Sequence, residues 1–305
     1  MAAAVTDPRH TDLYVSATTF LSEYRLHPDP ETYLAHGYVD LCLAAWPGAR
    51  GAQLNLATRW ALWTWLADDL LDDGLRSADR DEIHALYRDL LAAPIDGARL
   101  TTGHPLALAL TELCRATCAM MTAQWWERYR RHLFAWLGAA ADKLTDFLQP
   151  HRTPTLREYL ALRPTDGGMV LAAMWCELAE QCVTPDWNDP LVRSLVAAFS
   201  SVGFLTNDLA APDMDTFTAI AALAASQGLP PTEARQEALA LLAAEERRFW
   251  WLYTAVRDDE LDPATVQFAR SLDRFRYALT AWTRASSRYA PEAGGQLPVP
   301  GAMPR

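Results

Sequence analysis

An acidic run at residues 68–73 is the part of this sequence with the clearest capacity for chemistry. On a helix, Asp68 and Asp72 lie one turn apart on one face, and Asp69 lies beside them. Carboxylates stacked in this way repel one another unless a cation lies between them. Their hard oxygen atoms suit Mg²⁺, which also bridges to phosphate groups. The run therefore indicates a metal site, with a solvated acidic helix end as the alternative interpretation.

A second polar group closes an apolar segment near residue 207. Asn207, Ala211 and Asp215 are spaced by four residues. If the helix continues that far, Asn207 and Asp215 lie two turns apart on one face, where an amide oxygen and a carboxylate could hold another Mg²⁺. Pro212 works against such a continuous helix. The alternative interpretation is a capped helix end followed by an acidic loop.

The elements that must position these residues are helices. Apolar residues recur at helical spacing, and we find no alternating β-branched runs between turns. We expect one all-α domain of about ten helices over residues 1–305, with 290–305 as a tail or lid. The expected helical segments are 54–72, 106–147, 168–182, 191–209, 231–256 and 264–289.

Composition limits the possible partners. The 305-residue chain carries a net charge of −11, which makes nucleic acid an unfavourable ligand. No apolar run reaches the roughly 18 residues of a membrane span, and the first residues lack the pattern of a signal peptide. We therefore expect a cytoplasmic protein. Lys143 is the only lysine, and arginine suits forked recognition of phosphate oxygens, although compositional bias explains this equally well.

The two polar groups, in this order, resemble the metal motifs of class I terpene synthases, the bacterial members above all. The family carries a DDxxD motif, which Asp68, Asp69 and Asp72 match, and an Asn-Asp-x-x-Ser/Thr/Gly-x-x-x-Glu/Asp motif. Asn207 and Asp215 match the outer positions of the second motif. The resemblance implies three Mg²⁺ ions and a bound substrate diphosphate. Ala211 departs from the pattern because it stands where the family has a hydroxyl ligand or glycine.

Two further segments match the family. Residues 159–168 resemble its sensor segment, which implies Arg163 as the diphosphate sensor, Asp166 as the linker and Gly167 as the effector at a helix break. Near the end of the chain, Arg288 and Tyr289 resemble the Arg-Tyr pair that holds the diphosphate in this family. The implied fold is a class I terpenoid synthase helical bundle around a central active-site cavity.

Aromatic side chains would line that cavity, since aromatic faces stabilise carbocations without acting as bases. Trp65 lies one helical turn before Asp68, and Trp282 belongs to the C-terminal motif. We expect these two residues to line the pocket, and Phe204 to contact the substrate as well. Weaker candidates for the wall are Trp60, Trp63 and Trp175.

The resemblance implies a terpene cyclase that ionises a linear prenyl diphosphate. The Asp at the last position of the second motif and the C-terminal tail favour geranylgeranyl diphosphate, with farnesyl diphosphate or a cyclic diterpenyl diphosphate as alternatives. A chain-elongating prenyltransferase would need two DDxxD motifs. A non-catalytic helical binding protein or a degenerate synthase is the alternative of another class. A homodimer is an expectation drawn from the family.

Overall fold

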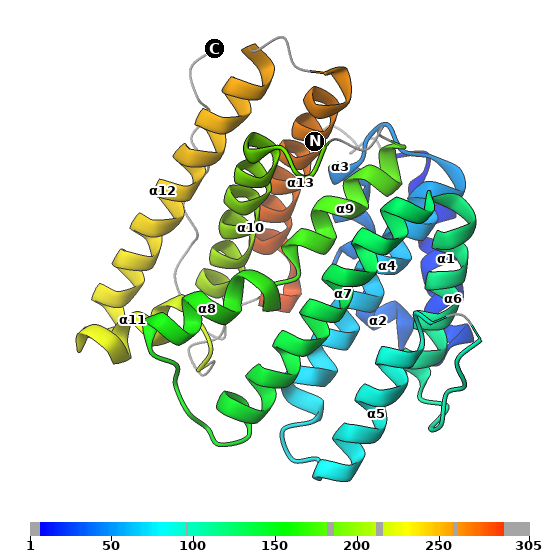
Figure 1. The fold of residues 1–305 in the computed structure, drawn as a ribbon, viewed down its shortest axis with the longest axis horizontal. Coiled ribbons are helices and arrows are strands. Elements are labelled where there is room, and N and C mark those ends of the chain that lie inside the picture. Colours follow the sequence, from blue (N-terminus) through cyan, green and yellow to red (C-terminus); the bar gives the residue numbers. More distant parts are fainter. Residues whose placement is uncertain (1–6, 96, 182–185, 212–215, 259–261, 290–305) are drawn as a thin grey trace, which may run out of the picture.

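The structure, a computed structural model, describes residues 7–95, 97–181, 186–211, 216–258 and 262–289. This part of the chain forms helices and no strands. The elements are α1 (His10–Glu23), α2 (Pro30–Leu34), α3 (Tyr38–Ala45), α4 (Gly51–Asp69), η1 (Leu70–Gly74), α5 (Arg80–Ala92), α6 (Pro105–Met120), α7 (Ala123–Lys143), η2 (Leu144–Leu148), α8 (Leu156–Asp166), α9 (Met169–Glu180), α10 (Pro190–Ala210), α11 (Ala219–Gln227), α12 (Pro231–Asp258), α13 (Pro263–Ala285) and η3 (Ser287–Tyr289). The expected all-α fold is confirmed (Figure 1).

Local capping explains where several of these helices begin. The Thr155 side chain accepts from the backbone of Glu158, and the Glu158 side chain accepts from the backbone of Thr155, which forms a capping box before α8. Asp189 caps α10 through two backbone N–H groups, and Pro190 follows at the first helical position. The helices that carry the sensor segment and the Asn207 motif therefore start from strong local signals.

The expected single helix over residues 106–147 is wrong. The chain leaves the helix at Met121, where the backbone is extended with φ −109° and ψ 160°. The Thr122 side chain then accepts from the backbone N–H of Trp125 and starts α7. Apolar periodicity continues across this junction because both helices bury a face in the same core, so the pattern alone does not show the break.

Helices from distant parts of the sequence lie side by side around the middle of the bundle. Helix α10 packs against α12 on one side and α13 on the other, and α4 packs against α9 (Figure 1). Wide π-helical turns follow directly after two of the helices, η1 after α4 and η2 after α7. Such turns interrupt the regular ladder and are frequent at functional sites. The turn η1 contains the second half of the acidic run, and η2 packs against η1.

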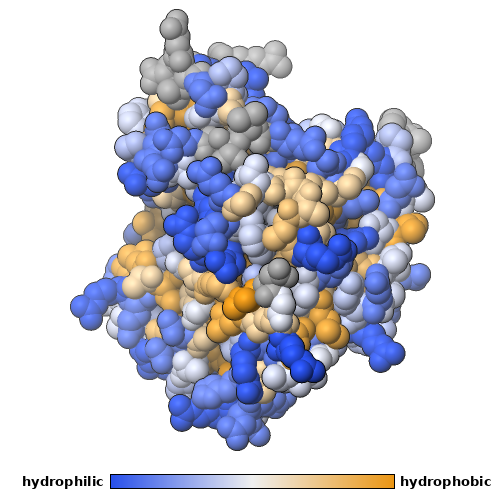
Figure 2. All heavy atoms as spheres, turned by 45° about the vertical axis from the view of Figure 1, so that its right-hand side comes forward, coloured by the Kyte–Doolittle hydropathy of each residue, from blue (hydrophilic) through white to orange (hydrophobic). Residues whose placement is uncertain are grey.

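The surface is mainly polar. Figure 2 shows a face on which hydrophilic side chains dominate and hydrophobic ones gather toward the middle. Single exposed apolar residues such as Trp251, with 72% of its surface accessible, are normal on folded proteins. Among the described residues, no helix is long and apolar enough to span a membrane.

Candidate active site

A cavity opens between α4, α9, α10 and α13. It is lined by Thr64, Trp65, Asp68, Trp136, Arg163, Asp166, Gly167, Gly168, Met169, Ala172, Trp175, Gly203, Phe204, Asn207, Phe275, Leu279, Thr283 and Tyr289. Most of the residues singled out in the sequence therefore face one space, which polar, aromatic and aliphatic side chains line together.

The acidic run does not form the single regular turn expected from its spacing. Helix α4 ends at Asp69, and Asp72 lies in the π-turn η1. Asp68 lines the cavity. The Asp69 carboxylate instead accepts from both terminal nitrogens of Arg288, at 2.8 and 2.5 Å. Asp72 is held by Lys143. Two of the three carboxylates expected to bind metal are thus already neutralised by basic side chains.

Lys143 is the residue that the sequence reasoning missed. Its side chain is 2% exposed, and its Nζ lies 2.7 Å from Asp72 Oδ1, 2.8 Å from Asp166 Oδ1 and 3.9 Å from Asp68 Oδ1. Burial opposes the charge of the ammonium, but the carboxylates of Asp166, Asp72 and Asp68 raise the pKa of Lys143 above its ordinary value. The one available signal was that this is the only lysine among 27 basic residues.

Arg163 joins the sensor segment to the end of α10. Its guanidinium donates to Asp166 Oδ2 at 2.8 Å, to Asp208 Oδ1 at 2.6 and 3.1 Å, and to Asn207 Oδ1 at 2.9 Å. Burial raises the pKa of Asp166, but Lys143 and Arg163 together bring that pKa below its ordinary value. The structure therefore brings Arg163, Asp166 and Asn207 together as the resemblance implied.

Asp208 has a role that its place in the motif did not reveal. It is fully buried, and its second oxygen accepts from the Tyr159 hydroxyl at 2.5 Å and from the Ala219 backbone N–H at 2.8 Å. Arg163 donates to the first oxygen, so both oxygens of the carboxylate are engaged. Asp208 thus anchors Arg163 within a network that also includes α8 and the start of α11.

The expected helix break at Gly167 is present. Helix α8 ends at Asp166, and α9 begins at Met169 after Gly168, which has a φ of +66°. A Cβ on Gly167 would lie 3.0 Å from Phe204 Cβ and 3.1 Å from the Arg163 carbonyl oxygen. Glycine is needed here because the break presses against α10. The break places Arg163 and Asp166 at the cavity wall.

The C-terminal pair reaches the site from η3. In addition to its two bonds to Asp69, Arg288 donates to the Tyr38 hydroxyl at 3.2 Å. The Tyr289 hydroxyl accepts from Asn207 Nδ2 at 2.8 Å. Arg288 therefore binds Asp69 of the first motif, and Tyr289 binds Asn207 of the second. The two residues connect the two motifs.

The turn before α3 holds this C-terminal segment in place. The His36 carbonyl oxygen accepts from Trp282 Nε1 and from the Ser286 hydroxyl, both at 2.7 Å. Gly37 follows with a φ of +84°, and a Cβ there would lie 3.4 Å from the Trp282 indole nitrogen. Sequence reasoning missed this turn because the contact spans nearly the whole chain and follows no local pattern.

The aromatic candidates divide between the cavity and the core. Trp65, Trp175 and Phe204 line the cavity. Trp282 was expected to line the cavity but does not; its ring packs behind the wall, 5.4 Å from the ring of Trp65 and 5.5 Å from that of Tyr289.

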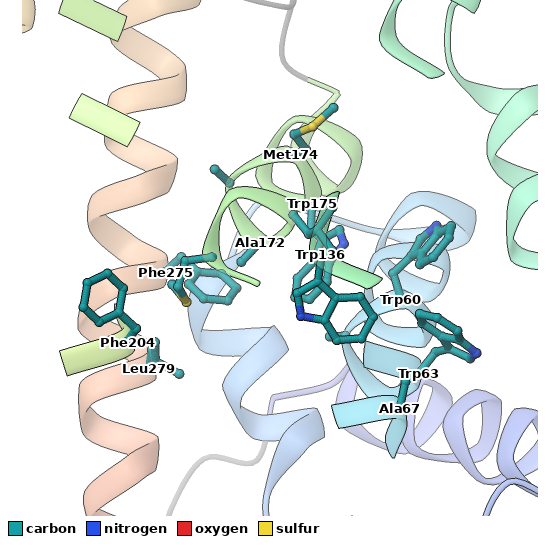
Figure 3. Close-up of a cluster of buried hydrophobic side chains, with 14 of the residues drawn as sticks. Trp60, Trp63, Ala67, Trp136, Ala172, Met174, Trp175, Phe204, Phe275 and Leu279 are labelled. Carbon is teal, nitrogen blue, oxygen red and sulfur yellow. The ribbon is translucent and has the colours of Figure 1, made fainter. Parts of the chain in front are cut away.

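Two of the weaker candidates are wrong, because Trp60 and Trp63 point into the core. Both are fully buried, and they donate to the Thr117 hydroxyl and the Leu106 carbonyl of α6. Figure 3 shows them beyond Trp136, away from the cavity residues Phe204 and Leu279.

The second metal motif does not continue as a helix. Helix α10 ends at Ala210, and Ala211 is in an extended conformation with ψ 150°. The following proline accounts for this, since a residue before proline is disfavoured in the helical region. Asp215 lies outside the described residues. Asn207 is therefore the only expected ligand of this motif whose position is described.

The described residues contain no ready-made cluster of three or more His, Cys, Asp or Glu side chains for a metal ion. The donor chemistry nevertheless fits a hard divalent cation. Asp68 and Asp69 end one helix at the cavity, and the ammonium of Lys143 and the guanidinium of Arg288 already lie where positive charge is needed. These basic groups act as stand-in cations. Asp68 and Asp69, with the amide of Asn207 across the cavity, are the described residues that could hold Mg²⁺.

Comparison with known proteins connects this site to a family. The family model described as terpene synthase family 2, C-terminal metal binding, matches residues 59–248. Pentalenene synthase of Streptomyces exfoliatus is 29% identical over 182 residues, 59% of this chain and 53% of that protein. The (+)-T-muurolol synthase of Roseiflexus castenholzii, named as (2E,6E)-farnesyl diphosphate cyclizing, is 26% identical over 262 residues, 82% and 79% of the two chains. The chain spans about half the length of the first curated relatives it matches.

A solved structure supports the same fold. A variant of cucumene synthase superposes with a TM-score of 0.80 at 22% identity, covering 93% of this chain and 97% of the other. At this identity the likeness concerns the fold. The expected helical bundle around a central cavity is confirmed.

Proposed function

This chain belongs to terpene synthase family 2, a family of class I terpene synthases, and we propose that it is a Mg²⁺-dependent cyclase of a linear prenyl diphosphate. The observation that carries the proposal is the arrangement at the cavity. Two carboxylates, the Arg163 guanidinium and the Asn207 amide line the cavity together with aromatic and aliphatic side chains. The polar groups suit a diphosphate and the aromatic ones suit the hydrocarbon chain.

Departure of the diphosphate is the demanding step, because negative charge accumulates on it. When bound, divalent metal ions neutralise that charge and act as Lewis acids. Arg163 and Arg288 would add forked, charge-assisted hydrogen bonds to the same group. In the substrate-free protein these arginines donate to Asp208 and Asp69. Binding then exchanges carboxylate partners for phosphate oxygens, and each exchange keeps the guanidinium paired.

The remaining wall would protect the carbocation. Trp65, Trp175 and Phe204 present aromatic faces that stabilise positive charge without accepting a proton. Burial of the chain among these groups also excludes water, which would quench the cation. The network from Asn207 to Tyr289 would close this space from the C-terminal side.

We propose farnesyl diphosphate as the first substrate to test and geranylgeranyl diphosphate as the second. The sequence favoured the longer chain. The relative whose name states its substrate cyclizes farnesyl diphosphate, which supports the shorter one.

Incubation of the protein with geranyl, farnesyl and geranylgeranyl diphosphates plus Mg²⁺, followed by gas chromatography of the extract, tests this proposal. We expect a cyclic hydrocarbon or alcohol from farnesyl diphosphate. A product from geranylgeranyl diphosphate alone would restore the preference drawn from the sequence. Absence of product from all three, and from cyclic diterpenyl diphosphates, would refute the enzyme function.

Four expectations remain proposals. They are the count of three Mg²⁺ ions, a single domain over residues 1–305, a cytoplasmic location and a homodimer. The proposed tail or lid at 290–305 lies outside the described residues.

A further inference from the structure

Lys143 is a buried charge that the proposed chemistry does not itself use. It is the last residue of α7, and its ammonium connects three elements. Asp72 comes from η1, Asp166 from the end of α8 and Asp68 from the end of α4. A buried ammonium is costly unless opposite charges compensate it. A side chain kept in this place therefore has a specific function in the site.

The carboxylates around Lys143 are engaged to different degrees. Both oxygens of Asp72 lie within 2.8 Å of Nζ, and both oxygens of Asp166 lie within 3.0 Å. Asp68 is at 3.9 Å, beyond hydrogen-bond distance. Asp72 and Asp166 are therefore bound to the lysine, while Asp68 keeps its oxygens toward the cavity.

We propose that Lys143 is a positioning residue that acts as a built-in cation of the diphosphate site. It occupies the place of a metal ion between Asp72 and Asp166, and Arg288 pairs with Asp69, so that Asp68 is the carboxylate of the acidic run left to bind metal. This inference rests on the proposed function, because it concerns the same metal-dependent site.

The position of Asp166 gives the lysine a second role. Asp166 accepts from Lys143 and also from Arg163, at 2.8 Å. The three side chains thus form a line from the acidic run to the arginine expected to sense the diphosphate. Through Asp166, Lys143 fixes where Arg163 points before substrate arrives. A compact ammonium with three donors suits this junction, where the carboxylates of Asp72 and Asp166 converge on one nitrogen atom.

Replacing Lys143 by methionine tests the proposal without any turnover measurement. In EDTA, Lys143→Met leaves buried carboxylates without their cation, and we expect Tm to fall by about 5 to 8 °C. Mg²⁺ alone should then raise the Tm of this variant, by about 2 °C at ten times its dissociation constant, because the metal can enter the emptied place. We expect Mg²⁺ to raise the Tm of the wild-type protein by a smaller amount.

Two further variants make the test decisive. Lys143→Met combined with Asp72→Asn removes one positive and one negative charge, and it should recover part of the Tm while losing the added response to Mg²⁺. In the wild-type background, titration calorimetry measures the Mg²⁺-dependent binding of inorganic diphosphate. The increase in dissociation constant caused by Asp72→Asn should be at least about tenfold smaller than the increase caused by Asp68→Asn. If Lys143→Met does not fold, this second comparison decides.

The proposal is overturned if Lys143→Met responds to Mg²⁺ no more than the wild type, or if Asp72→Asn weakens diphosphate binding as much as Asp68→Asn. The first result would make Lys143 a purely structural ion pair, and the second would make Asp72 a metal ligand. Neither result depends on terpene formation. Failure of the proposed catalytic function would instead appear as a wild-type protein that forms no product, whatever the stability data show.

Discussion

Replacing Arg163 by methionine should destabilise the substrate-free protein strongly. Methionine keeps the length and apolar stem of the side chain but removes every donor. Of the partners within the described residues, the carboxylate of Asp208 then keeps the Tyr159 hydroxyl and one backbone N–H, and that of Asp166 keeps Lys143. Both carboxylates remain buried, so each loses a charged partner and water cannot replace it.

The magnitude follows from this burial. Breaking a buried pair by removing one partner costs about 3 to 5 kcal/mol. For a chain of 305 residues, an unfolding entropy of about 2.1 cal/mol/K per residue converts this into a fall in Tm of about 5 to 8 °C. Differential scanning calorimetry in EDTA measures the fall directly.

An exposed ion pair in the same chain provides the matched control. Arg152 donates to Glu158 at 3.0 Å, and about 45% of the arginine side chain is accessible. Arg152→Met should lower the stability by no more than about 1 kcal/mol, because exposed pairs contribute little. If Arg163→Met lowers Tm no more than Arg152→Met does, the buried network does not carry the charge compensation assigned to it.

Three other variants test separate parts of the structure. Asp68→Ala should reduce Mg²⁺-dependent turnover by at least about 100-fold while the far-UV circular dichroism stays unchanged, and retained activity would contradict its metal role. Gly37→Ala should cost about 1 to 2 kcal/mol in urea unfolding, since its φ of +84° disfavours a Cβ; no loss would show that the turn relaxes. Burial raises the pKa of Asp89, but four hydrogen bonds from two threonines bring it below its ordinary value. Asp89→Ala should therefore lower the free energy of unfolding by about 2 kcal/mol at pH 7. The difference in this free energy from the wild type should become smaller as pH falls below about 4, and a difference that does not change with pH would refute the linkage.

Much of the fold follows from local pattern. Apolar periodicity and the breaks at Pro and Gly identify most of the long helices. The break at Met121 was not predicted, because an apolar face continues through both flanking helices. The helices before α4 were not predicted, and the position of α3 depends on Trp282, which lies far along the chain.

The site was predictable where the family motif and the local backbone agree. Gly167 marks a true helix break, and Arg163 meets Asn207 as its spacing implied. The partners of the charges were not predictable. Lys143 lies between Asp72 and Asp166 only because α7, η1 and α8 converge, which is a property of tertiary packing. The same holds for Tyr38 beside Arg288.

Release of inorganic diphosphate from farnesyl diphosphate tests the central claim most directly. We expect release in Mg²⁺ at the same rate as terpene formation, and a fall of at least about 100-fold in EDTA, because the carboxylates and arginines alone do not neutralise the leaving group. Release at the same rate with and without metal, or no release from any prenyl diphosphate, would contradict metal-dependent ionisation in this cavity.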